Sequence, residues 1–352
     1  HVHKNMYTEL HARSAFSFLR GSSQPEALVR QAAALGMGQL VVCDRDGFYG
    51  SARVHYAAKE CGGMRASVGA EVTLQDGTAL PLLVQTREGY QNLCRLITQA
   101  QLRSPKGECQ VSLAELETFS GGLFCLTGDA IGPVQHALEI QQPKVAEKTL
   151  QRLVEIFGRD RVAVEIQRHR VRGEHHRNRQ LIDLAAAHKL PVVATNAPLF
   201  AERGGRFVAD AFTCLRHHVS LDQAGSLLAP NSERFIKNGA MMRDLFADLP
   251  QALEQSARIA ETLEFTLENL GYQFPTPPIE PGQTREALLT ERTYAGARTR
   301  YGTVTQKIKA QLEHELELIC RLGFSGYFLI VQDIVDFAKS RGFLVQGRGS
   351  AA

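Results

Sequence analysis

The feature that most restricts the fold of this sequence is an alternation of short apolar runs with amphipathic stretches between about residues 8 and 200. Apolar runs bounded by turn residues predict buried strands, here at 7–10, 40–43, 67–74, 81–85, 122–127, 162–167 and 191–195. The runs are almost continuously hydrophobic, as in parallel strands covered by helices. We therefore predict an α/β fold, a closed or nearly closed barrel of six or seven units, with an open doubly wound sheet as the alternative.

Apolar residues at helical spacing predict the helices and the division of the chain into domains. Helices are expected at 25–35, 89–100, 144–157, 178–188, 250–263, 284–300, 304–321 and 326–340. The proline-rich stretch 273–283 predicts a linker. We expect a tail at 1–6, a first domain with a helical extension at 7–272, and a truncated, mostly helical second domain at 284–352. In the helix at 304–321, Leu312, Leu316 and Ile319 form a core-facing stripe.

Composition excludes several classes of protein. Seven cysteines are scattered without a C-x-x-C pair, which fits neither a disulfide framework nor a structural zinc site and favours a reduced, cytoplasmic protein. No apolar run approaches the roughly 20 residues that cross a bilayer, so no membrane contact is expected. A formal net charge of +3 permits contact with nucleic acid without requiring it.

Imidazoles and carboxylates occur in or just after the predicted strands, where a parallel barrel gathers its functional groups. These candidates are His11, Asp44, Glu71, Asp129 and His169. Converging at one barrel mouth, they would suit a divalent metal ion. Polar residues end most strands, so this pattern alone is a weak signal.

Several motifs in one order make the pattern more specific. The motifs are Glu9-Leu10-His11-Ala12-Arg13-Ser14 and the segments at 16–21, 42–45, 68–71, 127–129, 165–169 and 193–196. Together they resemble the PHP (polymerase and histidinol phosphatase) domain at the front of bacterial DNA polymerase III alpha subunits. The resemblance runs from about residue 7 to residue 352. It implies a distorted (β/α)7 barrel followed by the mostly helical start of a polymerase palm.

The departures from this family bear directly on the metal site that the resemblance implies. Matching ligands remain at His11, Asp44, Glu71 and His169, while Asp129 is a different potential ligand. The other ligand positions are substituted, by Arg13, Arg45, Ala79, Ala197 and Leu199. A guanidinium keeps its proton and cannot bind a metal ion, so we expect Arg13 and Arg45 to pair with Asp44 and Glu71. This predicts a metal-free structural pocket, with a residual single-ion site as the alternative.

The segments 322–331 and 346–352 together resemble the start of the palm in the same family. The resemblance implies that the loop Gly347, Arg348, Gly349 and Ser350 lies near nucleotide phosphates, which suits its backbone N–H groups and cation. In the family the Mg²⁺-binding aspartates follow this loop. Polymerase activity with Mg²⁺ is therefore expected of the full-length protein and not of this chain alone. The pair Asp44 and Asp46 is rejected as the catalytic pair, because it belongs to the PHP segment and has Arg45 between its members.

The opening motif, which lacks the second histidine, is most similar to the error-prone, damage-induced branch of the family. This implies translesion synthesis on a DNA primer-template with dNTPs, and as partners a sliding clamp and an inactive Y-family-like mutagenesis protein. The alternatives are an active PHP phosphoesterase or 3′–5′ exonuclease, and a replicative alpha subunit. The basic run 168–179 could contact DNA, although such runs are more often solvated surface. Phe16 and Phe18 are expected to pack in the core.

Overall fold

The structure is a computed structural model that describes residues 7–270 and 275–347. The expected tail at 1–6, the boundary at 272–273 and the loop residues Arg348, Gly349 and Ser350 lie outside the described residues. The chain divides into two compact units, His1–Asn269 and Leu270–Ala352, which are described separately below.

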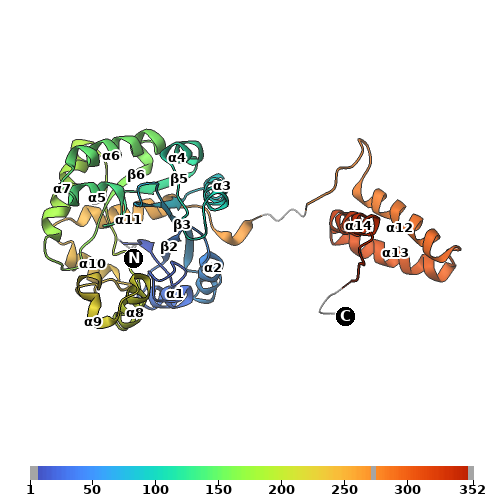
Figure 1. The fold of residues 1–352 in the computed structure, drawn as a ribbon, viewed down its shortest axis with the longest axis horizontal. Helices are drawn as coiled ribbons and strands as arrows, with labels where there is room; N and C mark the ends of the chain where they lie inside the picture. The colour runs from blue at the N-terminus through green and yellow to red at the C-terminus, as the bar shows by residue number, and fades with distance from the viewer. Residues whose placement is uncertain (1–6, 271–274, 348–352) are drawn as a thin grey trace, which may run out of the picture. The chain divides into compact units, whose positions relative to one another are not determined.

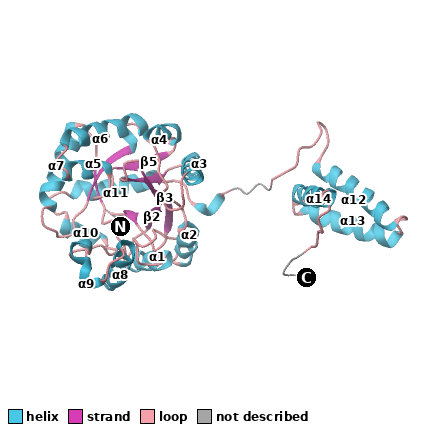
Figure 2. Cartoon of the chain, viewed as in Figure 1, coloured by secondary structure: helices cyan, strands magenta, loops and turns pink. Residues whose placement is uncertain are grey.

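The first unit contains one seven-stranded sheet with helices outside it (Figures 1 and 2). Its strands are β1 (Glu9–Ala12), β2 (Gln39–Arg45), β3 (Arg65–Thr73), β4 (Ala79–Val84), β5 (Leu123–Leu126), β6 (Val162–Ile166) and β7 (Val192–Ala194). Each strand pairs with the next one in the chain, in the order β1 to β7. The seven predicted strands are therefore confirmed, as is the α/β class.

The direction of β4 differs from the prediction. β4 is antiparallel to both β3 and β5, whereas the remaining neighbours are parallel. The short turn between Leu74 and Thr78 sets this direction, because a parallel return needs a crossover of a dozen or more residues. All six residues of β4 are buried, so its apolar run gave no sign of direction.

A helix lies where the two edges of the sheet approach one another. Helix α11 (Pro250–Thr262) packs against both β7 and β1. Ile259 and Ala260 share a buried cluster with Leu10 of β1 and Val193 of β7. The backbone N–H of Thr8 also donates to Ser256 Oγ at 3.1 Å. The sheet is thus a curled half-barrel that α11 covers, which is the nearly closed form of the prediction.

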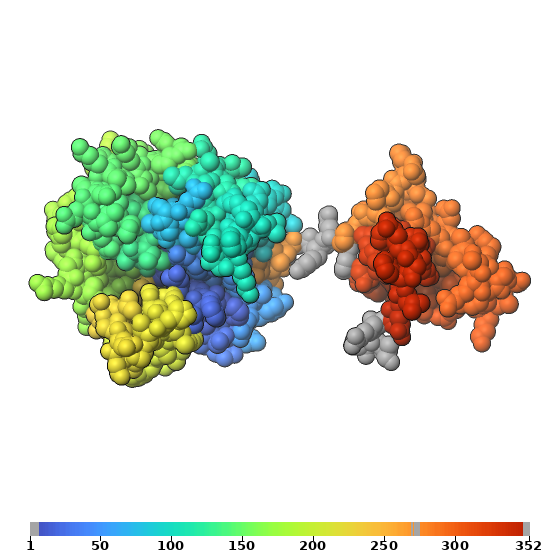
Figure 3. Space-filling view, in the orientation of Figure 1, coloured from blue at the N-terminus to red at the C-terminus, as the bar shows by residue number. Residues whose placement is uncertain are grey.

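The remaining helices of this unit surround the sheet. They are α1 (Pro25–Ala34), α2 (Ser51–Glu60), α3 (Arg87–Arg103), α4 (Leu113–Phe119), α5 (Pro133–Glu139), α6 (Pro143–Phe157), α7 (Glu174–Ala187), α8 (Arg206–His217), α9 (Leu221–Ala224) and α10 (Gly239–Leu245). The segment carrying α8 and α9, yellow in Figure 3, lies beside the blue N-terminal segment. Arg216 of α8 donates to the carbonyl of Leu19 at 3.1 Å, and Ser22 Oγ donates to the carbonyl of Gly205 at 2.9 Å.

The second unit contains three helices within residues 275–347: α12 (Arg285–Tyr301), α13 (Gln306–Arg321) and α14 (Ser325–Ser340). Leu289, Leu316 and Leu329, one from each helix, form its buried core, and Ile319 packs against them. Among the described residues, no single helix is long and apolar enough to span a membrane. α13 and α14 meet that test only together, and they are bent by 116° at the break between them.

Candidate functional site

His11, on β1, uses both ring nitrogens for hydrogen bonds to buried carboxylates. Its Nδ1 lies 2.8 Å from Glu165 Oε1 and its Nε2 lies 2.9 Å from Glu71 Oε1. Ionised carboxylates only accept hydrogen bonds, so both nitrogens carry protons and the ring is an imidazolium. Burial lowers the pKa of His11, but the charge of Glu165 and the hydrogen bonds to both carboxylates raise it to about 9.

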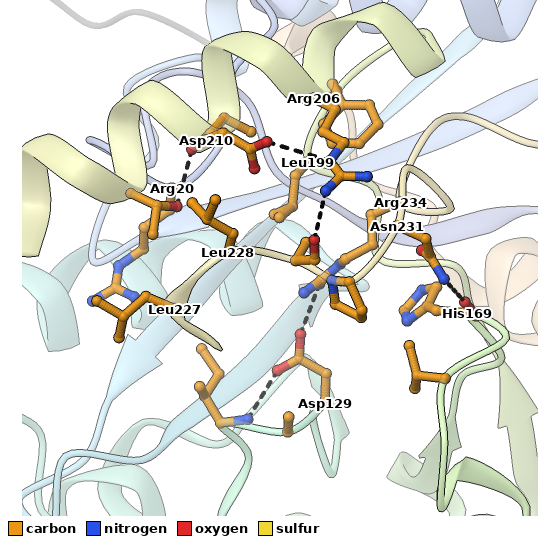
Figure 4. Close-up of a pocket in the computed structure, with 18 of the residues that line it drawn as sticks. Arg20, Asp129, His169, Leu199, Arg206, Asp210, Leu227, Leu228, Asn231 and Arg234 are labelled. Carbon is orange, nitrogen blue, oxygen red and sulfur yellow. Dashed lines mark hydrogen bonds and ion pairs between the residues drawn. The ribbon is translucent and has the colours of Figure 1, made fainter. Parts of the chain in front are cut away.

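Arg13 lies one residue beyond β1 and joins two carboxylates. Its Nε donates to Glu71 Oε2 at 2.9 Å, and its Nη2 donates to Asp129 Oδ2 at 2.9 Å and also to Glu71 Oε1. Asp129 Oδ2 accepts a second bond, from Arg234 Nη2 at 2.9 Å (Figure 4). Burial raises the pKa values of Glu71 and Asp129, but the charge of Arg13 outweighs it and holds both well below their usual range. Cations and carboxylates therefore compensate one another in this buried cluster.

The partners of Asp44 differ from the prediction, because serine residues rather than an arginine donate hydrogen bonds to its carboxylate. Ser14 donates to it from the backbone N–H at 2.9 Å and from Oγ, and Ser17 Oγ donates at 2.8 Å. Arg45 Nε instead donates to Thr73 Oγ1 at 2.8 Å, while Arg45 Nη1 lies 3.7 Å from Glu71 Oε2. The expected pairing of an arginine with Asp44 is wrong, whereas Glu71 has Arg13 as a partner and Arg45 nearby.

The other predicted metal positions have structural roles. The Nε2 of His169 donates to the carbonyl of Asn196 at 2.8 Å, and burial and the nearby charge of Arg234 lower the pKa of His169 to about 3. The N–H of Ala79 donates to the carbonyl of Ile131 at 2.8 Å. Ala197 has a left-handed backbone with φ 41°, and Leu199 lines a cavity.

The residues at these positions do not fit a metal ion. Neither nitrogen of the His11 imidazolium has a lone pair to offer, and Arg13 holds oxygens of both Glu71 and Asp129. Glu165 Oε2 is a buried carboxylate oxygen that has no hydrogen-bond partner in the part of the chain that the structure describes, but it is a single ligand atom, whereas zinc binds about four. Within residues 7–270 and 275–347, no group of three or more His, Cys, Asp or Glu side chains is arranged to hold an ion.

A cavity of about 530 Å³ adjoins this buried cluster. Asp129, His169 and Arg234 border it, as Figure 4 shows, and Arg13 reaches it. Its lining contains seven arginines and two aspartates: Arg13, Arg20, Arg172, Arg177, Arg206, Arg216, Arg234, Asp129 and Asp210. Such an excess of guanidinium groups favours anions.

Two segments of the chain match known protein families. Residues 9–169 match the family described as PHP domain, and residues 287–352 match the bacterial DNA polymerase III alpha NTPase domain. The chain thus contains a segment similar to PHP domains followed by a segment similar to the bacterial DNA polymerase III alpha NTPase domain. It is 39% identical over 360 residues to an error-prone DNA polymerase of Mycolicibacterium paratuberculosis, covering 98% of this chain and 33% of that protein. Identity is 37% to the error-prone DNA polymerase of Pseudomonas aeruginosa, covering 100% of this chain and 32% of that protein.

The chain thus spans about a third of the length of these curated relatives. Among solved structures, an amidohydrolase from Chromobacterium violaceum aligns with 54% of this chain and 87% of its own. Its identity is 13% and its TM-score is 0.39.

The sequence-based predictions missed several residues of the first unit. The sequence could have identified Glu165 as a candidate site residue, because it is a charged residue inside the buried strand β6. Glu9 was similarly placed in β1, and it accepts from Tyr7 Oη at 2.6 Å and from the N–H of Asn196 at 2.9 Å. Arg234 follows β7 by 40 residues in an irregular segment, where no periodic pattern marks it.

The remaining predictions concern surface residues. Phe18 is 79% exposed, so core packing is wrong for it, while Phe16 is half-buried beneath the guanidinium of Arg53. In the basic run 168–179, Arg168 pairs with Asp248, and Arg172 and Arg177 line the cavity. Gly347, the one described residue of the glycine loop, is exposed.

Proposed function

We propose that the protein to which this chain belongs is an error-prone DNA-directed DNA polymerase that acts in damage-induced mutagenesis and translesion synthesis. The observation that carries this proposal is the similarity to error-prone DNA polymerases over 98% of the chain. The order of the two family matches, PHP domain first and polymerase III alpha second, supports it. A replicative alpha subunit is less favoured, because these relatives bear the error-prone name.

In this proposal the PHP unit is a structural or interaction scaffold and not a phosphoesterase. A metal-dependent phosphoesterase needs an ion to lower the pKa of water and to stabilise the charge that develops on phosphate. The contacts of Arg13 and His11 support the scaffold role, since they occupy the carboxylate oxygens that an ion would require.

The same proposal includes the cofactor, substrates and partners of the longer protein. Mg²⁺ would support nucleotidyl transfer, with the loop Gly347 to Ser350 near the phosphates of the incoming nucleotide. The substrates would be a DNA primer-template and dNTPs, and the partners a sliding clamp and an inactive Y-family-like mutagenesis protein. Because bacterial DNA lies in the cytoplasm, so would the protein.

The second unit supports its assignment to a larger polymerase domain. Large apolar side chains are exposed on and after α14: Ile334 and Phe337 at 62% and 60%, and Phe343 at 65%. Exposed large apolar side chains that lie close together in the sequence favour packing against another protein segment. In the proposed polymerase, the remainder of the palm would cover it.

Primer extension tests the proposal. A protein that continues this chain to the length of its relatives is expected to extend a primer with Mg²⁺, and to insert opposite a template lesion. The 352-residue chain alone is expected to incorporate no nucleotide. The measurement is gel-resolved extension of a labelled primer, with both proteins at equal concentration.

A second assay on the same labelled DNA separates the alternative function. Incubation of the 352-residue chain with Mn²⁺ or Zn²⁺ is expected to release no nucleotide from the 3′ end. Metal-dependent release would instead support an active phosphoesterase. Absence of extension by the longer protein would refute the polymerase assignment, and extension by the 352-residue chain would refute the assignment of catalysis to later residues.

A further inference from the structure

The cavity beside the former metal positions carries positive charge that its own carboxylates do not neutralise. Arg234 and Arg13 share Asp129, and Arg206 lies 3.3 Å from Asp210. Three arginines of the lining, Arg20, Arg172 and Arg216, have no carboxylate partner anywhere in residues 7–270 and 275–347.

Arg20 and Arg216 approach each other at one side of the cavity. The Nη1 of Arg216 donates to the carbonyl of Leu19, directly beside Arg20. Burial and the neighbouring charges of Arg45 and Arg216 lower the pKa of Arg20 to about 10, at which it still carries its charge at neutral pH. Two half-buried guanidinium groups that repel one another gain stabilisation from an anion placed between them.

Another part of the cavity is apolar. Leu199, Phe200, Leu227 and Leu228 contribute to its lining, and Figure 4 shows Leu199, Leu227 and Leu228 among the charged groups. The volume of about 530 Å³ lies within the range of roughly 300–1,000 Å³ found for small-molecule sites. The cavity can therefore hold an anionic group together with an apolar one.

We propose that this cavity binds a nucleotide-sized organic phosphate, held by Arg20, Arg216 and Arg234 without a metal ion. Guanidinium forks match phosphate oxygens in a bidentate geometry, and the leucine side chains provide an apolar surface for a base. Two ligands offer this group, a free nucleoside monophosphate and the terminal nucleotide of a DNA strand. The proposal does not depend on polymerase activity, because all of these residues belong to the PHP unit.

Calorimetric titration of the 352-residue chain in EDTA tests this site. The probes are dAMP and a short single-stranded oligonucleotide with a terminal phosphate. Arg20→Gln and Arg216→Gln are each expected to weaken binding about tenfold, which corresponds to about 1.4 kcal/mol. Binding is also expected to weaken as salt rises, because the attraction is electrostatic. The matched control is Arg30→Gln, which removes an exposed arginine of α1 that lies 3.8 Å from Glu60, and it should leave the affinity unchanged.

The two probes distinguish the sources of the phosphate. Binding of dAMP identifies a free nucleotide site, and binding of the oligonucleotide alone identifies a strand-end site; both agree with the proposal. Thermal melting checks that each variant folds. If Arg20→Gln does not fold, Arg216→Gln provides the same comparison. Failure of both probes to bind, equal binding by the Arg20 and Arg30 variants, or binding only after Mn²⁺ is added would overturn the proposal.

Discussion

Replacing Arg13 by methionine is expected to lower the free energy of unfolding by about 3–5 kcal/mol, the usual cost of removing one partner from a buried ion pair. The side chain of Arg13 is 3% exposed, and it contacts both Glu71 and Asp129. Without Arg13, the buried carboxylates of Glu71 and Asp129 lose a cation that compensates their charge, and a water molecule in its place would not supply that charge. The measurement is urea unfolding at pH 7, followed by circular dichroism.

Arg152→Met is the matched control for this variant. Arg152 also contacts two carboxylates, Glu117 and Glu155, but all three side chains are substantially exposed. Water screens exposed ion pairs, so the loss of stability should be much smaller than for Arg13. Equal losses in the two variants would show that Arg13 has no special role in compensating the buried carboxylates.

The second large effect is a loss of stability as pH rises from 6.5 to about 9. The pKa of His11 is raised from 6.5 to about 9, so in this window the folded chain binds a proton that the unfolded chain releases. The contribution of His11 is fully present below pH 6.5 and is lost as pH rises through 9. A shift of this size corresponds to roughly 3 kcal/mol.

His11→Gln isolates this contribution, since glutamine keeps hydrogen-bonding groups and does not titrate. The free energy difference between the unaltered chain and the variant is expected to shrink steadily between pH 6.5 and 9.5. Lys237 has a pKa lowered to about 8 by burial and acts in the opposite direction at high pH, but it is present in both proteins and cancels. A difference that stays constant over this window would mean that His11 is neutral, and the imidazolium interpretation would fail.

The sequence predicted the positions of the strands better than their directions. Apolar runs indicate which segments of the chain are buried. All seven strands are buried segments, and they lie at or near the predicted runs for that reason. The direction of β4 depends instead on the turn before it, with Gly77 in a left-handed conformation at φ 83°. The covering of the sheet edges by α11 depends on contacts between residues about 250 positions apart, such as Thr8 with Ser256, which periodicity does not encode.

The candidate site was predictable in its chemistry and not in its pairing. Arg13 was recognisable as a fixed cation at a ligand position, because its chemistry is independent of the fold. Which carboxylate it meets depends on register and side-chain reach, and the hydroxyls of Ser14 and Ser17 compete successfully for Asp44. Arg234 comes from a segment without periodic structure, so only the folded chain brings it to Asp129.

His11 and Arg13 bind the oxygens of Glu71, Glu165 and Asp129, so we expect these positions to hold no metal ion. Metal content tests it most directly: the purified chain is saturated with Zn²⁺ and Mn²⁺, dialysed against metal-free buffer, and analysed by inductively coupled plasma mass spectrometry. We predict far less than one ion per chain. Two or three retained ions per chain, lost when Glu71 is replaced by glutamine, would contradict the account.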